Sequence, residues 1–135
     1  MTLESGNAST PVAAATLLWH WPAALAGGLI GSLLWLVTIN GPAEIVAAGV
    51  AALCIAGTGA GLLRPPSGEQ VRARKWAAAF PWRFALAPAA GAGAIVWLAQ
   101  AVLGGGIFIG MFDALGWALV VFLVVGVAGV LLRDR

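Results

Sequence analysis

The sequence is poor in the residues that most enzymes use for chemistry. Among its 135 residues there are one cysteine, one histidine and no tyrosine, and only 9% are charged. A lone cysteine excludes an internal disulfide and a thiolate metal site, and a lone histidine gives haem or metal no second imidazole. No GxSxG, phosphate-binding loop, HExxH or CxxC pattern occurs. The sequence therefore predicts neither an enzyme nor a cofactor or metal site.

What the chain has in excess is apolar residues, which make up 61% of it. Soluble domains are about 25% charged, so lipid is the expected solvent for most of this surface. Four apolar segments stand out, and each is close to the ~20 helical residues that cross ~30 Å of hydrocarbon. We expect an all-α integral membrane protein, with a polar tail at 1–15 and one transmembrane domain at 16–135. The predicted spans are 21–39, 43–63, 84–103 and 107–132, the first preceded by an interfacial turn at Val12–His20.

The basic residues are confined to two short stretches, which predicts the topology. They are Arg64, Arg72, Arg74, Lys75, Arg83, Arg133 and Arg135. With four spans, both termini and the hydrophilic loop at 67–83 share one side, and all seven basic residues lie there. Three spans would separate the two basic stretches. Because Lys and Arg favour the cytoplasmic side, we expect both termini in the cytoplasm, and a prokaryotic inner membrane as the location.

Small residues are spaced as expected for closely packed helices. Gly27 and Gly31 form one small-xxx-small pair, and Gly57 and Gly61 form another. In the second span, alanines repeat every four residues from Ala48 to Ala60. Such positions let helix backbones approach each other in lipid. Glycine and alanine are also simply abundant in this chain, so some of these pairs arise by chance.

Two acids near the predicted outer surface are candidates for an ion or proton site. Asp113 lies about two turns into the fourth segment, where a carboxylate costs roughly 2.5–3.5 kcal/mol, which suggests a function. Alternatively the helix begins near Asp113, and the carboxylate caps it. Glu44 follows Pro42 and is explained either as a first-turn acid or as a relay group. In a folded bundle the two acids could meet.

The remaining polar and reactive side chains have plainer explanations. Arg72, Arg74, Lys75 and Arg83 are expected to contact anionic lipid headgroups. His20, between two tryptophans, is expected at the inner membrane boundary. Cys54 is expected to be a small buried apolar residue.

Part of the chain resembles a known family. The stretch LLWLVTINGPAEIVAAGVAALCIAGTGAGLLRPP at 33–66 resembles the N-terminal hairpin of the E-type component of the Mrp/Mnh multisubunit cation/proton antiporters. The matching positions are Leu34-Trp35-Leu36, Gly41 and Gly49, and the segment Ala79–Arg83 resembles the Pro-containing stretch that follows. The resemblance implies an accessory membrane component, since other subunits carry the ion-translocating residues. That family continues into a polar cytoplasmic domain, whereas this chain continues into two further apolar segments.

Three functions follow as hypotheses. The first is a small non-catalytic accessory subunit of a multisubunit membrane complex of the Mrp antiporter type. Its partners would be other membrane subunits and lipids, and not nucleic acid. The second is a self-sufficient homo-oligomeric transporter or channel that uses Asp113. The third is an accessory subunit of a respiratory or photosynthetic complex.

Overall fold

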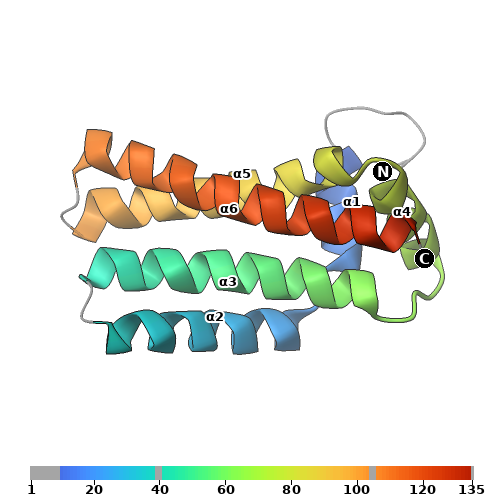
Figure 1. Ribbon diagram of the computed structural model, residues 1–135, viewed down its shortest axis with the longest axis horizontal. Coiled ribbons are helices and arrows are strands. Elements are labelled where there is room, and N and C mark those ends of the chain that lie inside the picture. Colours follow the sequence, from blue (N-terminus) through green and yellow to red (C-terminus); the bar gives the residue numbers. More distant parts are fainter. Residues whose placement is uncertain (1–9, 39–40, 104–105, 135) are drawn as a thin grey trace.

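The computed structural model describes residues 10–38, 41–103 and 106–134, and this part of the chain is helical apart from turns and short connections. The six helices, in chain order, are α1 (Thr10–Leu18), α2 (Trp21–Val37), α3 (Pro42–Leu63), α4 (Glu69–Ala79), α5 (Pro81–Leu103) and α6 (Ile107–Arg133). Helices α2, α3, α5 and α6 run side by side, whereas α1 and α4 lie across one end of the bundle (Figure 1).

Several helices are suited to a membrane. Helices α3, α5 and α6 are each long and apolar enough to cross one, and α1 with α2 adds a fourth candidate if that bent pair is counted as one span. The all-helical class expected from the sequence is therefore confirmed for the described residues, which contain three candidate membrane spans, or up to four. Helix α2 has 17 residues, or ~25 Å at about 1.5 Å per residue.

Two segments differ from the sequence-based expectation. Helix α1 begins at Thr10, inside the segment expected to be a polar tail, because Ala13, Ala14 and Leu18 are buried against the bundle. The hydrophilic stretch after Pro66 is not an open loop. It forms α4, whose buried Ala73 and Ala77 lie one turn apart on the face that packs inward. Residues 1–9 of the expected tail lie outside the described part.

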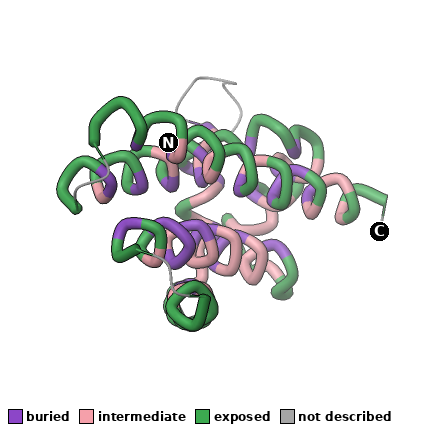
Figure 2. The backbone as a smooth tube through the Cα atoms, turned by 60° about the vertical axis from the view of Figure 1, so that its left-hand side comes forward, coloured by how far each residue is buried: buried purple, intermediate pink, exposed green. Residues whose placement is uncertain are grey.

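The core has two parts. The larger cluster lies where α1, α3, α4, α5 and α6 converge and includes the fully buried Phe84 and Val121. The smaller cluster joins Ala47 of α3, Val96 of α5 and Ala114 of α6. Outward faces of the helices are exposed along much of the bundle (Figure 2). In lipid these faces would contact acyl chains or another protein.

The basic residues of the described chain gather at one end. Arg64 follows α3, Arg72, Arg74 and Lys75 lie on α4, Arg83 is in the first turn of α5, and Arg133 ends α6. Figure 1 places these helix ends together beside α1 and α4, while the last turns of α2 and α5 and the first turns of α3 and α6 lie at the opposite end.

Candidate functional site

The acid singled out from the sequence, Asp113, lies inside a helix. Helix α6 begins at Ile107 with Gly106 as its N-cap residue, so the alternative in which Asp113 caps the helix is wrong. Gly106 adopts φ 82°, a conformation that glycine tolerates and that lets the chain enter α6 early. The Asp113 carboxylate is therefore half-buried in the second turn.

Asp113 has a partner on the neighbouring helix. The side-chain amide of Gln100, a buried residue in the last turn of α5, donates a hydrogen bond to Oδ2 of Asp113. A Cβ atom on Gly110 would lie 2.6 Å from Cβ of Gln100, so only glycine there lets the two helices come this close. Nearby, Nε1 of Trp97 donates to the carbonyl of Ile107 at 3.1 Å. The α5–α6 hairpin is thus held together near its turn by polar contacts.

The Asp113–Gln100 pair offers few atoms to which a ligand could bind. A carboxylate that accepts one amide hydrogen bond keeps a second oxygen for a proton or a cation. Glu44 is exposed in the first turn of α3, and among the described residues no hydrogen bond or ion pair joins it to Asp113. Within the same residues, no three His, Cys, Asp or Glu side chains come together as a metal site.

Gly27 and Gly31 lie in the α2–α3 contact. A Cβ atom on Gly27 would run into Ala56, and one on Gly31 would run into Ala52 while lying 3.0 Å from the carbonyl of Ala48. These alanines belong to the four-residue repeat of α3. The two helices are therefore in contact through small side chains and backbone.

Gly57 and Gly61 accommodate a different feature, the bend between α1 and α2. The two helix axes differ by 89°. A Cβ on Gly57 would lie 2.9 Å from the Trp19 ring, and one on Gly61 would collide with the carbonyl of Leu18. In addition, the backbone N–H of His20 donates to the carbonyl of Gly57 at 3.2 Å. The bend is thus fixed to α3 by backbone contacts that only small residues allow.

The four basic residues expected at lipid headgroups have different surroundings. Arg72 and Lys75 are exposed on α4. Nη1 of Arg74 donates to the carbonyl of Arg64 at 3.3 Å, and the Arg83 guanidinium lies over the Phe80 ring, 5.4 Å from its centre. An arginine over an aromatic face gains a cation–π attraction, which orients Arg83 beside the chain entering α5.

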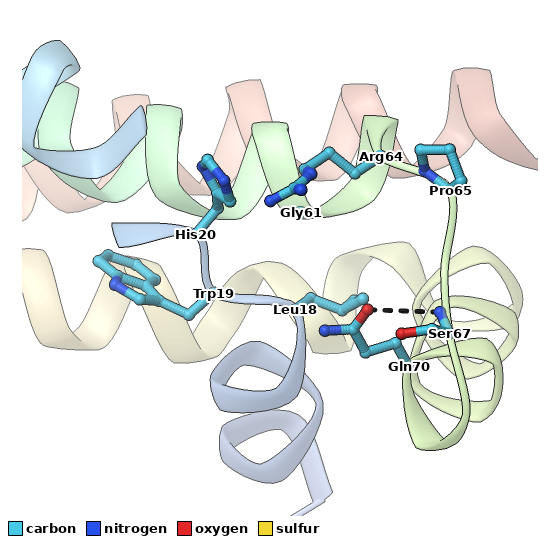
Figure 3. Close-up of a pocket in the computed structure, with 8 residues that line it drawn as sticks. All are labelled: Leu18, Trp19, His20, Gly61, Arg64, Pro65, Ser67 and Gln70. Atoms are coloured by element: carbon cyan, nitrogen blue, oxygen red, sulfur yellow. Dashed lines mark hydrogen bonds between the residues drawn. The ribbon is translucent and has the colours of Figure 1, made fainter. Parts of the chain in front are cut away.

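Sequence inspection alone missed two features. The first is the pairing of Gln100 with Asp113. A polar cavity at the α1–α2 bend was not foreseen (Figure 3). A signal for the bend was present, since His20 precedes Pro22, and proline favours the first turn of a helix. His20 is indeed the N-cap of α2.

Comparison of the chain with protein-family models, with curated proteins and with solved structures finds no match.

Proposed function

We propose that this protein is a non-catalytic accessory subunit of a multisubunit membrane complex. In this proposal α2, α3, α5 and α6 each span an inner, prokaryotic membrane, and the end that carries α4 faces the cytoplasm. The distribution of basic residues supports this orientation, because those of the described chain gather at that end. Helix α1 then lies along the membrane surface.

The observation that carries the accessory role is a stripe on α6. This helix has the most apolar 18-residue stretch of the three long helices, with a mean hydropathy of 2.7, and only 22% of that stretch is buried. Phe108, Phe112, Leu115 and Leu119 are 56–78% exposed. Their alternating four- and three-residue spacing is that of a helix–helix seam. Large aromatic side chains at a seam supply much contact area to a partner helix.

The resemblance of residues 33–83 to the E-type component favours an Mrp-type cation/proton antiporter as the complex. The resembling part covers the last turn of α2, all of α3 and the region up to the start of α5. It leaves the α6 stripe free for other subunits. A respiratory or photosynthetic complex would use the same stripe in the same way, so the identity of the partner chains separates these two alternatives.

Affinity purification from native membranes in a mild detergent tests the proposal. We expect the tagged protein to bring down other membrane subunits, and the F112A/L115A double variant to lose them. A matched double variant on α5, L86A/L98A, removes exposed apolar side chains outside the stripe and should keep the partners. A chain that purifies alone, or a partner set unaffected by F112A/L115A, would contradict the accessory role.

A second candidate function is a self-sufficient homo-oligomeric transporter or channel. The observation in its favour is the half-buried Asp113 carboxylate, held by Gln100 between α5 and α6. Ionisable groups within a membrane helix commonly mark an ion or proton pathway. Cation or proton flux in proteoliposomes should then occur with the purified chain and fall strongly in Asp113→Asn. Flux that is absent from the wild type, or unchanged in Asp113→Asn, removes this candidate.

A further inference from the structure

A cavity of about 240 Å³ opens beside the bend between α1 and α2 (Figure 3). One wall comes from the bend, and the other from the end of α3 and the connection into α4. A water molecule occupies about 30 Å³ of liquid volume, so the cavity has room for a group much larger than one water. Its lining residues are Leu18, Trp19, His20, Gly61, Arg64, Pro65, Ser67 and Gln70.

The charge lining this cavity is positive. Arg64 is the charged residue of the lining, which contains no Asp or Glu. Figure 3 shows the Arg64 side chain turned back along α3, with its guanidinium toward His20. A second guanidinium is close, because Nη1 of Arg74 bonds the carbonyl of Arg64 at 3.3 Å. An anion entering here would meet the Arg64 guanidinium, and Arg74, outside the lining, adds positive charge nearby.

His20 adds a hydrogen-bond donor to the cavity. Its Nδ1 accepts a hydrogen bond from the backbone N–H of Ala23 at 3.2 Å and so caps α2. A neutral imidazole whose Nδ1 is an acceptor carries its proton on Nε2. His20 therefore offers an N–H in addition to the guanidinium, and the N-terminus of α2 directs the positive end of its dipole to the same place.

Hydrogen bonds hold the opposite wall in place. Gln70 accepts from the backbone N–H of Ser67 at 3.4 Å through Oε1 and donates to the carbonyl of Leu17 at 3.2 Å through Nε2. Both functional groups of Gln70 are thus engaged. The residue ties α1 to the start of α4, so the two walls belong to segments that are bonded together.

The position of the cavity suits a lipid headgroup. Helix α1 meets α2 at 89°, and in a membrane crossed by α2 it would lie along the surface. The cavity is at the bend itself, on the end of the bundle where the basic residues gather. Phosphate groups of anionic phospholipids occupy this depth of the cytoplasmic leaflet.

We propose that this cavity binds a phosphate-bearing anion, through the Arg64 guanidinium and the His20 Nε2–H. Guanidinium groups form charge-assisted, often bidentate hydrogen bonds with phosphate oxygens. The anion is either the phosphate of an anionic phospholipid or a free phosphate. The proposal rests on the membrane-spanning arrangement of the proposed function but not on the accessory role.

The test uses the purified full-length protein in a neutral detergent. Its thermal midpoint is measured against short-chain phosphatidylglycerol, short-chain phosphatidylcholine and sodium phosphate. A site-bound anion stabilises the folded state by RT ln(1 + [L]/Kd), so the thermal midpoint keeps rising with the logarithm of the anion concentration above Kd. We expect phosphate-bearing anions to raise the midpoint along such a curve, with an affinity about tenfold weaker in Arg64→Gln. Arg72→Gln removes an exposed cation that does not line the cavity and should keep wild-type affinity.

A second variant keeps the proposal testable if Arg64→Gln folds poorly. His20→Asn retains a good N-cap for α2 but removes the imidazole N–H, and should weaken binding severalfold. A response to phosphatidylglycerol that exceeds the response to sodium phosphate identifies the lipid as the source, and an equal response identifies the free anion. The proposal is overturned if neither anion binds, if phosphatidylcholine binds as tightly as phosphatidylglycerol, or if Arg64→Gln and Arg72→Gln lose affinity equally. Partner chains play no part in this measurement, so failure of the accessory role leaves its result intact.

Discussion

The side-chain amide of Gln100 donates a hydrogen bond to the carboxylate of Asp113, linking the last turn of α5 to the second turn of α6. A polar pair of this kind is costly to leave unsatisfied in an apolar environment. It therefore fixes the register of the two helices, since a shift of either helix would separate the amide from the carboxylate.

Replacing Gln100 with Met tests this clamp, because Met fills similar space without a donor. The Asp113 carboxylate then lacks its partner, and we expect the free energy of unfolding to fall by about 0.5–2 kcal/mol. Asp113→Asn should cost less, since an amide oxygen still accepts from Gln100. Denaturant titration in mixed micelles measures both variants. Equal stability of Gln100→Met and wild type would show that the pair contributes nothing.

The α2–α3 contact should be sensitive to a single methyl group. A Cβ atom on Gly31 runs into Ala52 and approaches the Ala48 backbone, whereas one on Gly59 has no neighbour within 4 Å. We expect Gly31→Ala to lower the free energy of unfolding by about 1–3 kcal/mol through overpacking. Gly59→Ala should be neutral or stabilising by up to about 1 kcal/mol, because alanine favours helix. If both variants behave alike, the α2–α3 spacing is not set by Gly31.

Cysteine labelling tests the proposed orientation. Cys54 is buried, and a Cys54→Ser background removes it as a competing thiol. Single cysteines at Ser67 and at Asp134, near the basic end, should react with a membrane-impermeant maleimide from the cytoplasmic side. A cysteine at Gly41, in the connection at the other end, should react from the outside. Ser67 and Asp134 reacting from opposite sides would exclude the four-span arrangement.

The tie between α1 and α4 should be measurable by hydrogen exchange. Gln70→Ala removes the hydrogen bond to the Leu17 carbonyl, and a bond of this kind is worth about 0.5–1.5 kcal/mol. We expect amides of α1 to exchange up to about tenfold faster. The neighbouring Glu69→Ala alters an exposed side chain and serves as the control. Unchanged exchange in Gln70→Ala would mean that apolar packing alone holds α1.

The long helices were predictable because hydrophobic length in a membrane protein is a direct physical requirement. The expected span at 43–63 corresponds to α3 at Pro42–Leu63, and the expected span at 107–132 corresponds to α6 at Ile107–Arg133. The expected span at 21–39 corresponds to α2, which ends at Val37. The expected span at 84–103 corresponds to α5, which begins at Pro81. Proline is tolerated in the first turn of a helix, which accounts for the earlier start of α5.

Hydropathy could not show features that depend on neighbouring elements. Helix α4 is hydrophilic on average, yet Ala73 and Ala77 are buried because α1, α5 and α6 lie over them. The Asp113–Gln100 pair joins residues on separate helices, and no local pattern records that contact. The cavity at the bend likewise arises from the direction of α1, which Gly57 and Gly61 permit but do not by themselves predict.

The two hairpins have a consequence for biogenesis. In the proposed orientation, the α2–α3 connection at 38–41 and the α5–α6 connection at 104–106 are the two connections that have to cross to the outer surface. Neither connection contains a charged side chain. Each hairpin could enter the bilayer as a unit, without a motor to pull a hydrated loop across. Delivery to an insertase would then be enough for this part of the chain. Its insertion into the membrane should depend only slightly on the proton-motive force.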